Sequence, residues 1–365
     1  MSYTNGLDNP ELFFQTLTWS GNDTGTSRAF TLDGSENMQP DFVWTKIRTG
    51  WSADHNLFDS VRGAGKNLHS NSSEAEGTND QYGYVSSFDS DGFTVSNGSS
   101  GANPRYYNNE NGGTYVAWNW KAGTSFSNDA SSTGIGTIDS SGSFNNDSGF
   151  SIVSYVGTGS VATIKHGLNS EPYVIMVKST VGLADHWFIY HKSNGNTGSQ
   201  FLNLTNGFTS GSNDWNNTTP TSSVFTVGTQ NGISKNTATF IAYCFAEKKG
   251  YSKFGSYVGN GVASGGGPFI YLGFKPAFFL LKESSNADNW IIMDNKRLGY
   301  NPRNDHLFPN LNNAEYASDR LELMSNGVKV IDNDGSINTS GATYVFMAFA
   351  ESPFVNSNGV PNNAR

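Results

Sequence analysis

The chain has 365 residues and a formal net charge of −9, with 15 % charged residues, 13 % aromatic residues and 42 glycines. The aromatic content excludes disorder of the whole chain, because disordered segments are poor in aromatic residues. The acidic balance leaves no basic stripe to bind a phosphate backbone, so we expect no nucleic-acid partner. No apolar run approaches the 18 or so residues that a membrane-spanning helix needs, and the N-terminus lacks the features of a secretory signal. We therefore expect that the protein is synthesised in a cytosol and does not insert into a membrane.

Three copies of one unit follow each other along the chain. In each copy a proline precedes a lysine by six positions across an apolar strand, and these pairs are Pro40 and Lys46, Pro172 and Lys178, and Pro276 and Lys282. An opening segment with glycines precedes each pair, and a second apolar run follows it. Each copy closes with a similar strand, and the closing strands are TYVAWNW, TFIAYCF and TYVFMAF. A unit of about 100 residues is the size of a self-sufficient β-sandwich.

Turn signals support an all-β fold. Asn-Gly and Asp-Gly pairs recur between the apolar runs and favour two-residue hairpins, whereas helical periodicity is almost absent. We predict three tandem β-sandwich units, similar to jelly rolls. The Gly-, Ser- and Asn-rich stretch after the first unit has the composition of a flexible linker, and the chain ends are candidates for arms that contact neighbours. The predicted boundaries are an N-terminal arm over 1–14, unit 1 over 15–123, a linker over 124–149, unit 2 over 150–249, unit 3 over 250–352 and a C-terminal tail over 353–365.

The closing strands carry large residues in one phase and small residues in the other. Trp118 and Trp120 have large counterparts in the other two units, so we predict that this phase faces a core. The opposite phase, with Ala117 and Cys244, is small enough to let another layer approach. Cys244 is interpreted as a packing residue, and as the one cysteine it excludes an intramolecular disulfide.

The recurrent lysines are the most regular polar feature of the sequence. They share the phase of the apolar residues in their strands, and each lies near a strand end. We expect their stems to pack on apolar surface while their ammonium groups extend to water. Contact with an anion or a glycan is the alternative.

No constellation of residues predicts catalysis. A glycosidase needs two carboxylates about 5 to 9.5 Å apart, and the acidic pairs here are DxDG turns, with Asp89 and Asp91 in one and Asp332 and Asp334 in the other. Such turns also offer oxygen ligands, which leaves Ca²⁺ binding as a weak alternative. His186 and His191 are five positions apart, which on a strand sends their rings to opposite faces. We predict no catalytic residue, no cofactor and no metal ligand.

Aromatic residues in polar loops are the candidates for ligand contact. A planar ring in an Asn-rich loop suits stacking on a sugar face or burial in a protein interface. These rings differ between the units, whereas residues that the fold requires recur. The candidates are Trp51, Tyr106, Tyr107 and Trp215, and we expect half of them to serve packing alone.

Segments spread over nearly the whole chain carry a family resemblance. They include DSVRG, SFDSDGFTV, YVAWNWKAG, IAYCFAEKKGYSKFGSYVGNG, NWIIMDNKR and ATYVFMAFAESPFV, with GVPNNAR at the end. These segments resemble an uncharacterised repeat family found in virion proteins of marine tailed bacteriophages. The resemblance implies a phage structural protein associated with a tail or fibre and located in the virion, and it brings no catalytic residues.

From this resemblance we expect a tail fibre, spike or similar surface appendage that recognises the host surface. Its expected partners are other virion proteins, further copies of itself, for which a trimer fits, and a host glycan or protein. The first alternative is a capsid decoration or head-fibre protein, whose terminal arms would make the contacts. The second is a polysaccharide-degrading tailspike enzyme, which requires a carboxylate pair in a groove.

Overall fold

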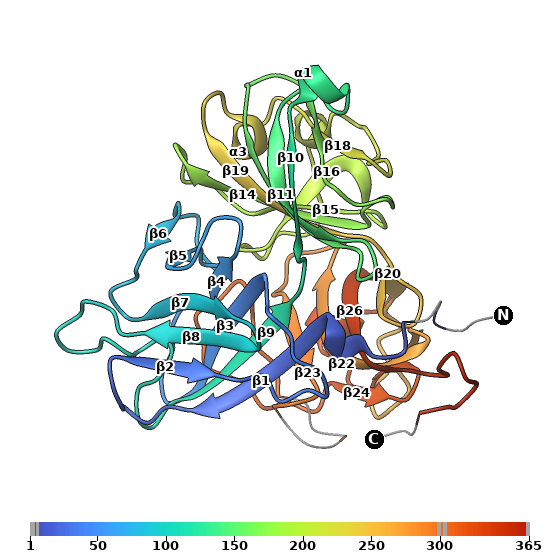
Figure 1. Ribbon diagram of the computed structural model, residues 1–365. Helices are drawn as coiled ribbons and strands as arrows, with labels where there is room; N and C mark the ends of the chain where they lie inside the picture. The colour runs from blue at the N-terminus through green and yellow to red at the C-terminus, as the bar shows by residue number, and fades with distance from the viewer. Residues whose placement is uncertain (1–3, 5–6, 298–300, 302–304, 363–365) are drawn as a thin grey trace.

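The computed structural model describes residue 4, residues 7–297, residue 301 and residues 305–362. It confirms the all-β prediction, because strands dominate the described chain and its helices are single turns. Three β-rich units, which we call unit 1 (β1 to β9), unit 2 (β10 to β19) and unit 3 (β20 to β26), gather around a common centre (Figure 1). Each unit is a β-sandwich that combines a larger with a smaller antiparallel sheet.

The larger sheets share one strand order. In unit 1 the closing strand β9 (Thr114–Trp120) lies between the opening strand β1 (Phe14–Ser20) and the Pro–Lys strand β3 (Phe42–Thr49), with β4 (Asn56–Asp59) outside β3. The equivalent order in unit 2 is β12 (Phe150–Val156), β19 (Thr239–Phe245), β14 (Val174–Val181) and β15 (Phe188–His191). In unit 3 it is β20 (Ser252–Val258), β26 (Thr343–Pro353), β22 (Phe274–Glu283) and β23 (Ile291–Asp294). The repeat in the sequence is therefore the strand framework of each unit.

The smaller sheet of each unit covers the small-residue face of the larger sheet. It is built from β2 (Ser27–Phe30), β8 (Gly92–Ser96) and β7 (Tyr84–Asp89) in unit 1, from β13 (Ala162–Lys165) and β18 (Val224–Val227) in unit 2, and from β21 (Phe269–Tyr271), β25 (Gly327–Val330) and β24 (Leu321–Met324) in unit 3. In unit 2, Phe225 and Val227 pack in one buried cluster with Ala242 and Cys244. The expectation that small residues let another layer approach is confirmed, and Cys244 is a packing residue.

The stretch 124–149, expected to be a flexible linker, is part of unit 2. It forms β10 (Thr124–Asn128), the single turn α1 (Ala130–Thr133) and β11 (Ser140–Asn145), which extend the sheet beyond β12. Phe126 and Phe144 pack against the unit 2 core with their ring centroids 6.0 Å apart. The linker prediction from composition is wrong because an edge hairpin needs few apolar side chains. The glycine at residue 142 has a packing role, since a Cβ there would lie 1.9 Å from the carbonyl oxygen of Ile152. At the opposite edge of that sheet, β16 (Gly195–Phe201) and β17 (Thr209–Ser210) follow β15.

The described parts of the two terminal segments, which were expected to be arms that contact neighbours, are in contact with each other. Asp8 accepts hydrogen bonds from the backbone N–H of Ser357, at 2.8 Å, and from its hydroxyl. Residues 1–3, 5–6 and 363–365 of these predicted arms lie outside the described residues. The remaining short elements are η1 (Pro10–Leu12), β5 (Lys66–Asn67), β6 (Gly77–Thr78), α2 (Ser212–Trp215), α3 (Asn231–Ser234) and α4 (Gly335–Asn338).

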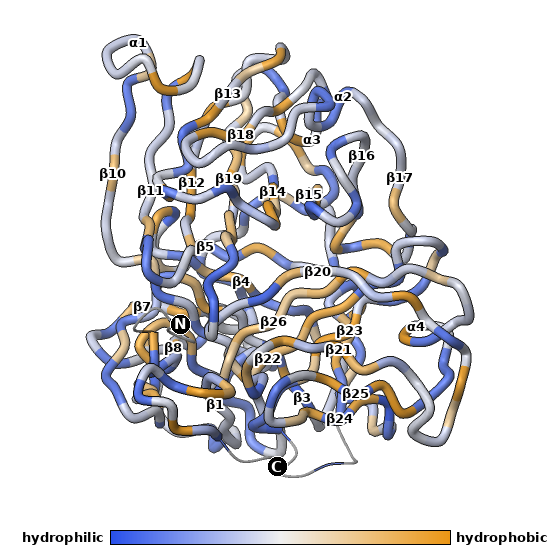
Figure 2. Tube along the Cα trace, turned by 90° about the vertical axis from the view of Figure 1, so that its right-hand side faces the viewer, coloured by the Kyte–Doolittle hydropathy of each residue, from blue (hydrophilic) through white to orange (hydrophobic). Residues whose placement is uncertain are grey.

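The large phase of each closing strand faces a core that all three units share. Trp120, Phe245 and Phe349 occupy the same position in their closing strands, and their ring centroids lie 6.5, 5.6 and 5.8 Å apart. The prediction of a core-facing phase is thus confirmed, but this core lies between the sandwiches and not inside one. Figure 2 shows hydrophobic stretches along β22, β23 and β26, where unit 3 contributes to it. The closing strand of each larger sheet is therefore buried on both faces, one within its own unit and one against the other two.

Candidate functional site

Three equivalent ring nitrogens join the units in a cycle. Trp187 of unit 2 donates from Nε1 to the carbonyl oxygen of His69 in unit 1 (2.9 Å), and Trp290 of unit 3 donates to that of Phe201 in unit 2 (2.9 Å). His55 of unit 1 closes the cycle, with its Nε2 3.1 Å from the carbonyl oxygen of Phe308 in unit 3. The Trp44 indole donates to His55 Nδ1, so Nε2 carries the proton. This cycle gives the molecule an approximate threefold arrangement within one chain.

A second set of contacts follows the same cycle with buried charges. Asp59 of unit 1 pairs with Arg62 at 2.5 Å and accepts a hydrogen bond from the Tyr243 hydroxyl of unit 2 at 2.7 Å. Asp294 and Arg297 of unit 3 repeat the pair at 2.6 Å, and Asp294 accepts from Nε1 of Trp118 in unit 1 at 2.9 Å. The repeated D-x-x-R segments are thus ties between units.

Unit 2 has no such ion pair at the equivalent position, and the reason lies in its neighbour. There His191 replaces the aspartate, and its Nε2 donates to the carbonyl oxygen of Phe346 at 3.2 Å. The side chain that unit 3 presents here is Met347, which has no proton to donate. A carboxylate at residue 191 would therefore lack the donor that Trp118 and Tyr243 supply elsewhere.

The recurrent lysines are buried, which corrects the expectation that their ammonium groups reach water. Lys46, Lys178 and Lys282 are each 0 % exposed. Lys178 Nζ donates to carbonyl oxygens of Asp185 (2.7 Å) and of Ser73 in unit 1 (3.0 Å), and Lys46 Nζ donates to Asn312 of unit 3 (3.3 Å). Burial lowers the pKa of Lys46 to about 7 and the pKa values of the other two to about 8. Lys46 and Lys178 thus hold loops of neighbouring units, whereas Lys282 donates to the carbonyl oxygens of Glu283 (2.6 Å) and Asn286 (3.5 Å) in its own unit. Buried in this way, the three ammonium groups offer no contact to an external anion.

Two of the four aromatic candidates are packing residues. Trp215 is 1 % exposed, donates from Nε1 to the Ser199 hydroxyl at 3.0 Å and packs edge-on against Tyr190. Tyr107 is 7 % exposed and donates its hydroxyl to Asp54 at 3.1 Å. These two are the half of the candidates that serve packing, because each indole or phenol finds a polar partner inside the fold.

The other two candidates form a half-buried ring pair on unit 1. Trp51 and Tyr106 stack with ring centroids 4.9 Å apart and planes 25° apart. Trp51 Nε1 donates to the Tyr106 carbonyl oxygen (3.3 Å), and the Tyr106 hydroxyl donates to the carbonyl oxygen of Ser52 (3.0 Å). A Cβ on Gly113 would lie 2.9 Å from Cη2 of Trp51, so this glycine makes room for the indole. The pair is a pre-formed aromatic surface, held by two loops 55 residues apart in sequence.

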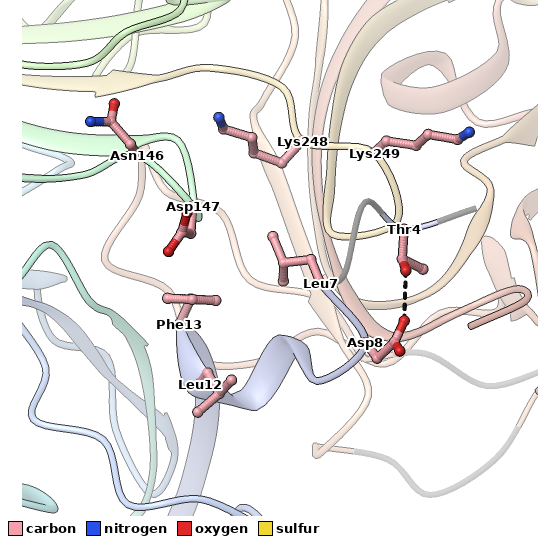
Figure 3. Close-up of a pocket in the computed structure, with 9 residues that line it drawn as sticks. All are labelled: Thr4, Leu7, Asp8, Leu12, Phe13, Asn146, Asp147, Lys248 and Lys249. Carbon is pink, nitrogen blue, oxygen red and sulfur yellow. Dashed lines mark hydrogen bonds between the residues drawn. The ribbon is translucent and has the colours of Figure 1, made fainter. Parts of the chain in front are cut away.

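A hollow of about 470 Å³ lies where the N-terminal segment meets the junction of units 2 and 3 (Figure 3). Its charged groups do not converge, since Lys248 and Lys249 extend in opposite directions. The Asp8 carboxylate accepts hydrogen bonds from the Thr4 hydroxyl at 2.6 Å and from the backbone N–H of Ser357. A wider hollow of about 620 Å³ lies beside the β10–β11 hairpin, and its polar groups Asn128 and Asp139 already bond within the protein. Neither hollow presents converging groups without partners.

The acidic turns have protein partners of their own. Asp89 accepts hydrogen bonds from Ser87 and Thr94, both at 2.7 Å, and Asp334 accepts from Ser336 and pairs with Arg320 at 2.7 Å. The Arg320 guanidinium opposes cation binding at Asp334, and at Asp89 both carboxylate oxygens already accept hydrogen bonds from hydroxyl groups, so the turn interpretation accounts for these carboxylates better than the Ca²⁺ alternative. Within the described part of the chain, no group of three or more His, Cys, Asp or Glu is placed to hold a metal ion. Nor does any described helix have the length and apolarity to cross a bilayer.

Comparisons with known proteins give a family but no activity. A family model described as a domain of unknown function (DUF7483) matches residues 9–353. No curated protein and no solved structure matches the chain. The match covers all three units, so the family domain is the whole threefold body and not a single sandwich.

Proposed function

The chain belongs to the DUF7483 family, and from the resemblance of its segments to virion proteins of tailed bacteriophages we propose that it is a phage virion structural protein, displayed on a tail fibre, spike or similar appendage to contact the host surface. The observation that carries this proposal is that the recurrent polar side chains serve the structure, whereas an aromatic pair in the loops of one unit does not recur. The regular polar groups lock three sandwiches into one body, while the Trp51–Tyr106 ring pair is held at the periphery and has no equivalent interaction among the described residues of the other units.

The architecture supports a passive binding role. A shared core and buried ties between units make a stiff particle, which suits a part that must survive outside a cell. The three units already reproduce within one chain the arrangement that three identical subunits would form, so stability does not require a homotrimer. We propose binding without turnover. Release of reducing ends from host polysaccharide incubated with the protein would contradict this.

The host-binding proposal is tested by adsorption of fluorescently labelled protein to susceptible cells. Trp51→Ser combined with Tyr106→Ser should reduce adsorption by about tenfold or more, because rigid aromatic contacts dominate binding surfaces. Val181→Ser, which removes an apolar side chain that is 58 % exposed on unit 2, is the control and should adsorb like the parent. If the double variant adsorbed as well as the parent, the host contact would lie at other residues. If the parent did not adsorb, host recognition would be refuted.

A capsid decoration protein is a second candidate, favoured by the approximate threefold arrangement. Three similar units in one chain present three similar outer surfaces, which suits attachment at a site of threefold symmetry. Electron cryo-microscopy of intact particles distinguishes the two candidates. Density on a tail or fibre supports host contact, whereas density spread over the capsid lattice supports decoration.

A further inference from the structure

The outward face of strand β21 in unit 3 carries two exposed aromatic side chains. Phe269 is 47 % exposed and Tyr271 is 55 % exposed, while Ile270 between them is 5 % exposed and belongs to the unit 3 core. Within the described sheet β21 pairs only with β25, so it is an edge strand. The fold needs only the inward residue for packing.

The other two units provide an internal control for these positions. Ile270 pairs with Val328, as Ile164 pairs with Phe225 in unit 2 and Phe30 pairs with Phe93 in unit 1. By this register, the positions of Phe269 and Tyr271 are held by Ala29 and Thr31 in unit 1 and by Thr163 and Lys165 in unit 2. The same sandwich therefore folds with small or polar residues there, and the two rings of unit 3 are not a requirement of the fold.

The two rings belong to one patch. Tyr271 is paired with Gly327 on β25, and a Cβ on Gly327 would lie 2.9 Å from Cζ of Phe269. The Phe269 ring thus lies over the residue that faces Tyr271 across the sheet. Glycine at residue 327 allows this placement.

Lysines flank the patch, and the Nζ of one of them, Lys329, donates to the carbonyl oxygen of Gly267 at 2.5 Å. Lys253 Nζ lies 5.2 Å from the Tyr271 ring centroid, and Lys329 is paired with Phe269 across the sheet. Beside Tyr271 is a hollow of about 330 Å³, lined also by Lys253, Lys249 and Glu247. Glu322 lies across from Lys329 on β24. Three lysines against two glutamates leave a local positive excess on a chain whose net charge is −9.

We propose that this face of unit 3 binds an acidic saccharide, a sugar chain that bears carboxylate or sulfate groups. This adds a second binding surface to the proposed host contact and rests on that proposal for its biological meaning. The apolar C–H face of a sugar ring can lie on an exposed aromatic ring, while lysine ammonium groups pair with its acidic groups. A protein partner fits less well, because lysine and glutamate are depleted from the cores of protein interfaces. The hollow falls within the range of about 300 to 1,000 Å³ typical of small-ligand sites.

The test measures binding to the purified full chain by isothermal titration calorimetry. The probes are an alginate oligosaccharide, a sulfated carrageenan oligosaccharide and, as a neutral comparison, a maltooligosaccharide. Phe269→Ala with Tyr271→Thr installs the residues of unit 1 and should fold normally, yet weaken binding of the acidic probe by about tenfold or more. Lys253→Gln should weaken the acidic probe and reduce its salt dependence. Val181→Thr is the matched control and should bind like the parent.

Each result decides the proposal. It is overturned if neither acidic probe binds, if the neutral probe binds equally well, or if the double variant binds like the parent. Loss of a parent dimer in the double variant, seen by sedimentation, would instead assign the patch to a second copy of the chain. Because these measurements use no cells, a failure here leaves adsorption through Trp51 and Tyr106 untouched, and a failure of adsorption leaves saccharide binding intact.

Discussion

Replacing Phe349 by alanine tests whether the three units form one cooperative body. Phe349 is 1 % exposed, and its ring centroid lies within 6.0 Å of rings from every unit. Those rings are Phe14 and Trp120 in the unit 1 sheet, Phe245 in unit 2, and Tyr251, Phe254 and Phe278 in unit 3. A buried Phe→Ala substitution costs about 3 to 5 kcal/mol. Each lost aromatic pair adds about 0.5 to 1.5 kcal/mol without strict additivity, so we expect a loss near the upper end of the range.

The assay is urea unfolding followed by circular dichroism and tryptophan fluorescence. The midpoint should fall without a change in slope, and both probes should report one transition, because the core that Phe349 fills is common to all units. Phe269→Ala, at a 47 % exposed position, is the control and should change the free energy of unfolding by less than about 0.5 kcal/mol. A Phe349→Ala variant within about 1 kcal/mol of the parent, or a separate transition for unit 3, would refute the shared core.

Three further predictions concern buried charge and reactivity. Arg297→Leu should destabilise by about 3 to 5 kcal/mol, because Asp294 is left charged and buried. The same urea assay checks it, and a loss no larger than that of Lys192→Ala, whose ion pair with Glu171 is half exposed, would contradict it. Cys244 should resist a thiol reagent in the native protein and react after unfolding, because burial raises its pKa to about 12; rapid native labelling would disprove the packing role. The free energy of unfolding should rise by at least about 2 kcal/mol between pH 7 and 9.5. Burial lowers the pKa values of the repeat lysines to about 7 or 8, so the unfolded chain, whose lysines keep a pKa near 10.5, binds more protons across this window. A flat or falling urea midpoint over that range would exclude buried lysines with lowered pKa values.

The sequence by itself determined the strand framework, because β structure has a short period that adjacent residues record. The three Pro-to-Lys strands, the closing strands and the alternation of large with small residues could all be read from spacing. The role of Cys244 followed in the same way, since it occupies the small phase. Each of these inferences depends on neighbours within a few positions of one another, where covalent geometry limits which face a side chain can take.

Only the tertiary structure decided what each face packs against. Alternation assigns Trp118 to a buried face but cannot distinguish the inside of one sandwich from a core shared by three. The burial of Lys178 depends on a carbonyl oxygen 105 residues away, and the burial of Trp215 depends on its contact with Ser199. The polar hairpin at 124–149 is ordered by the sheet edge beside it and not by its own composition. The exposed rings of β21 could be recognised only from the strand pairing that aligns the three units. Surface exposure and equivalence between repeats are properties of the assembled molecule and not of any local segment.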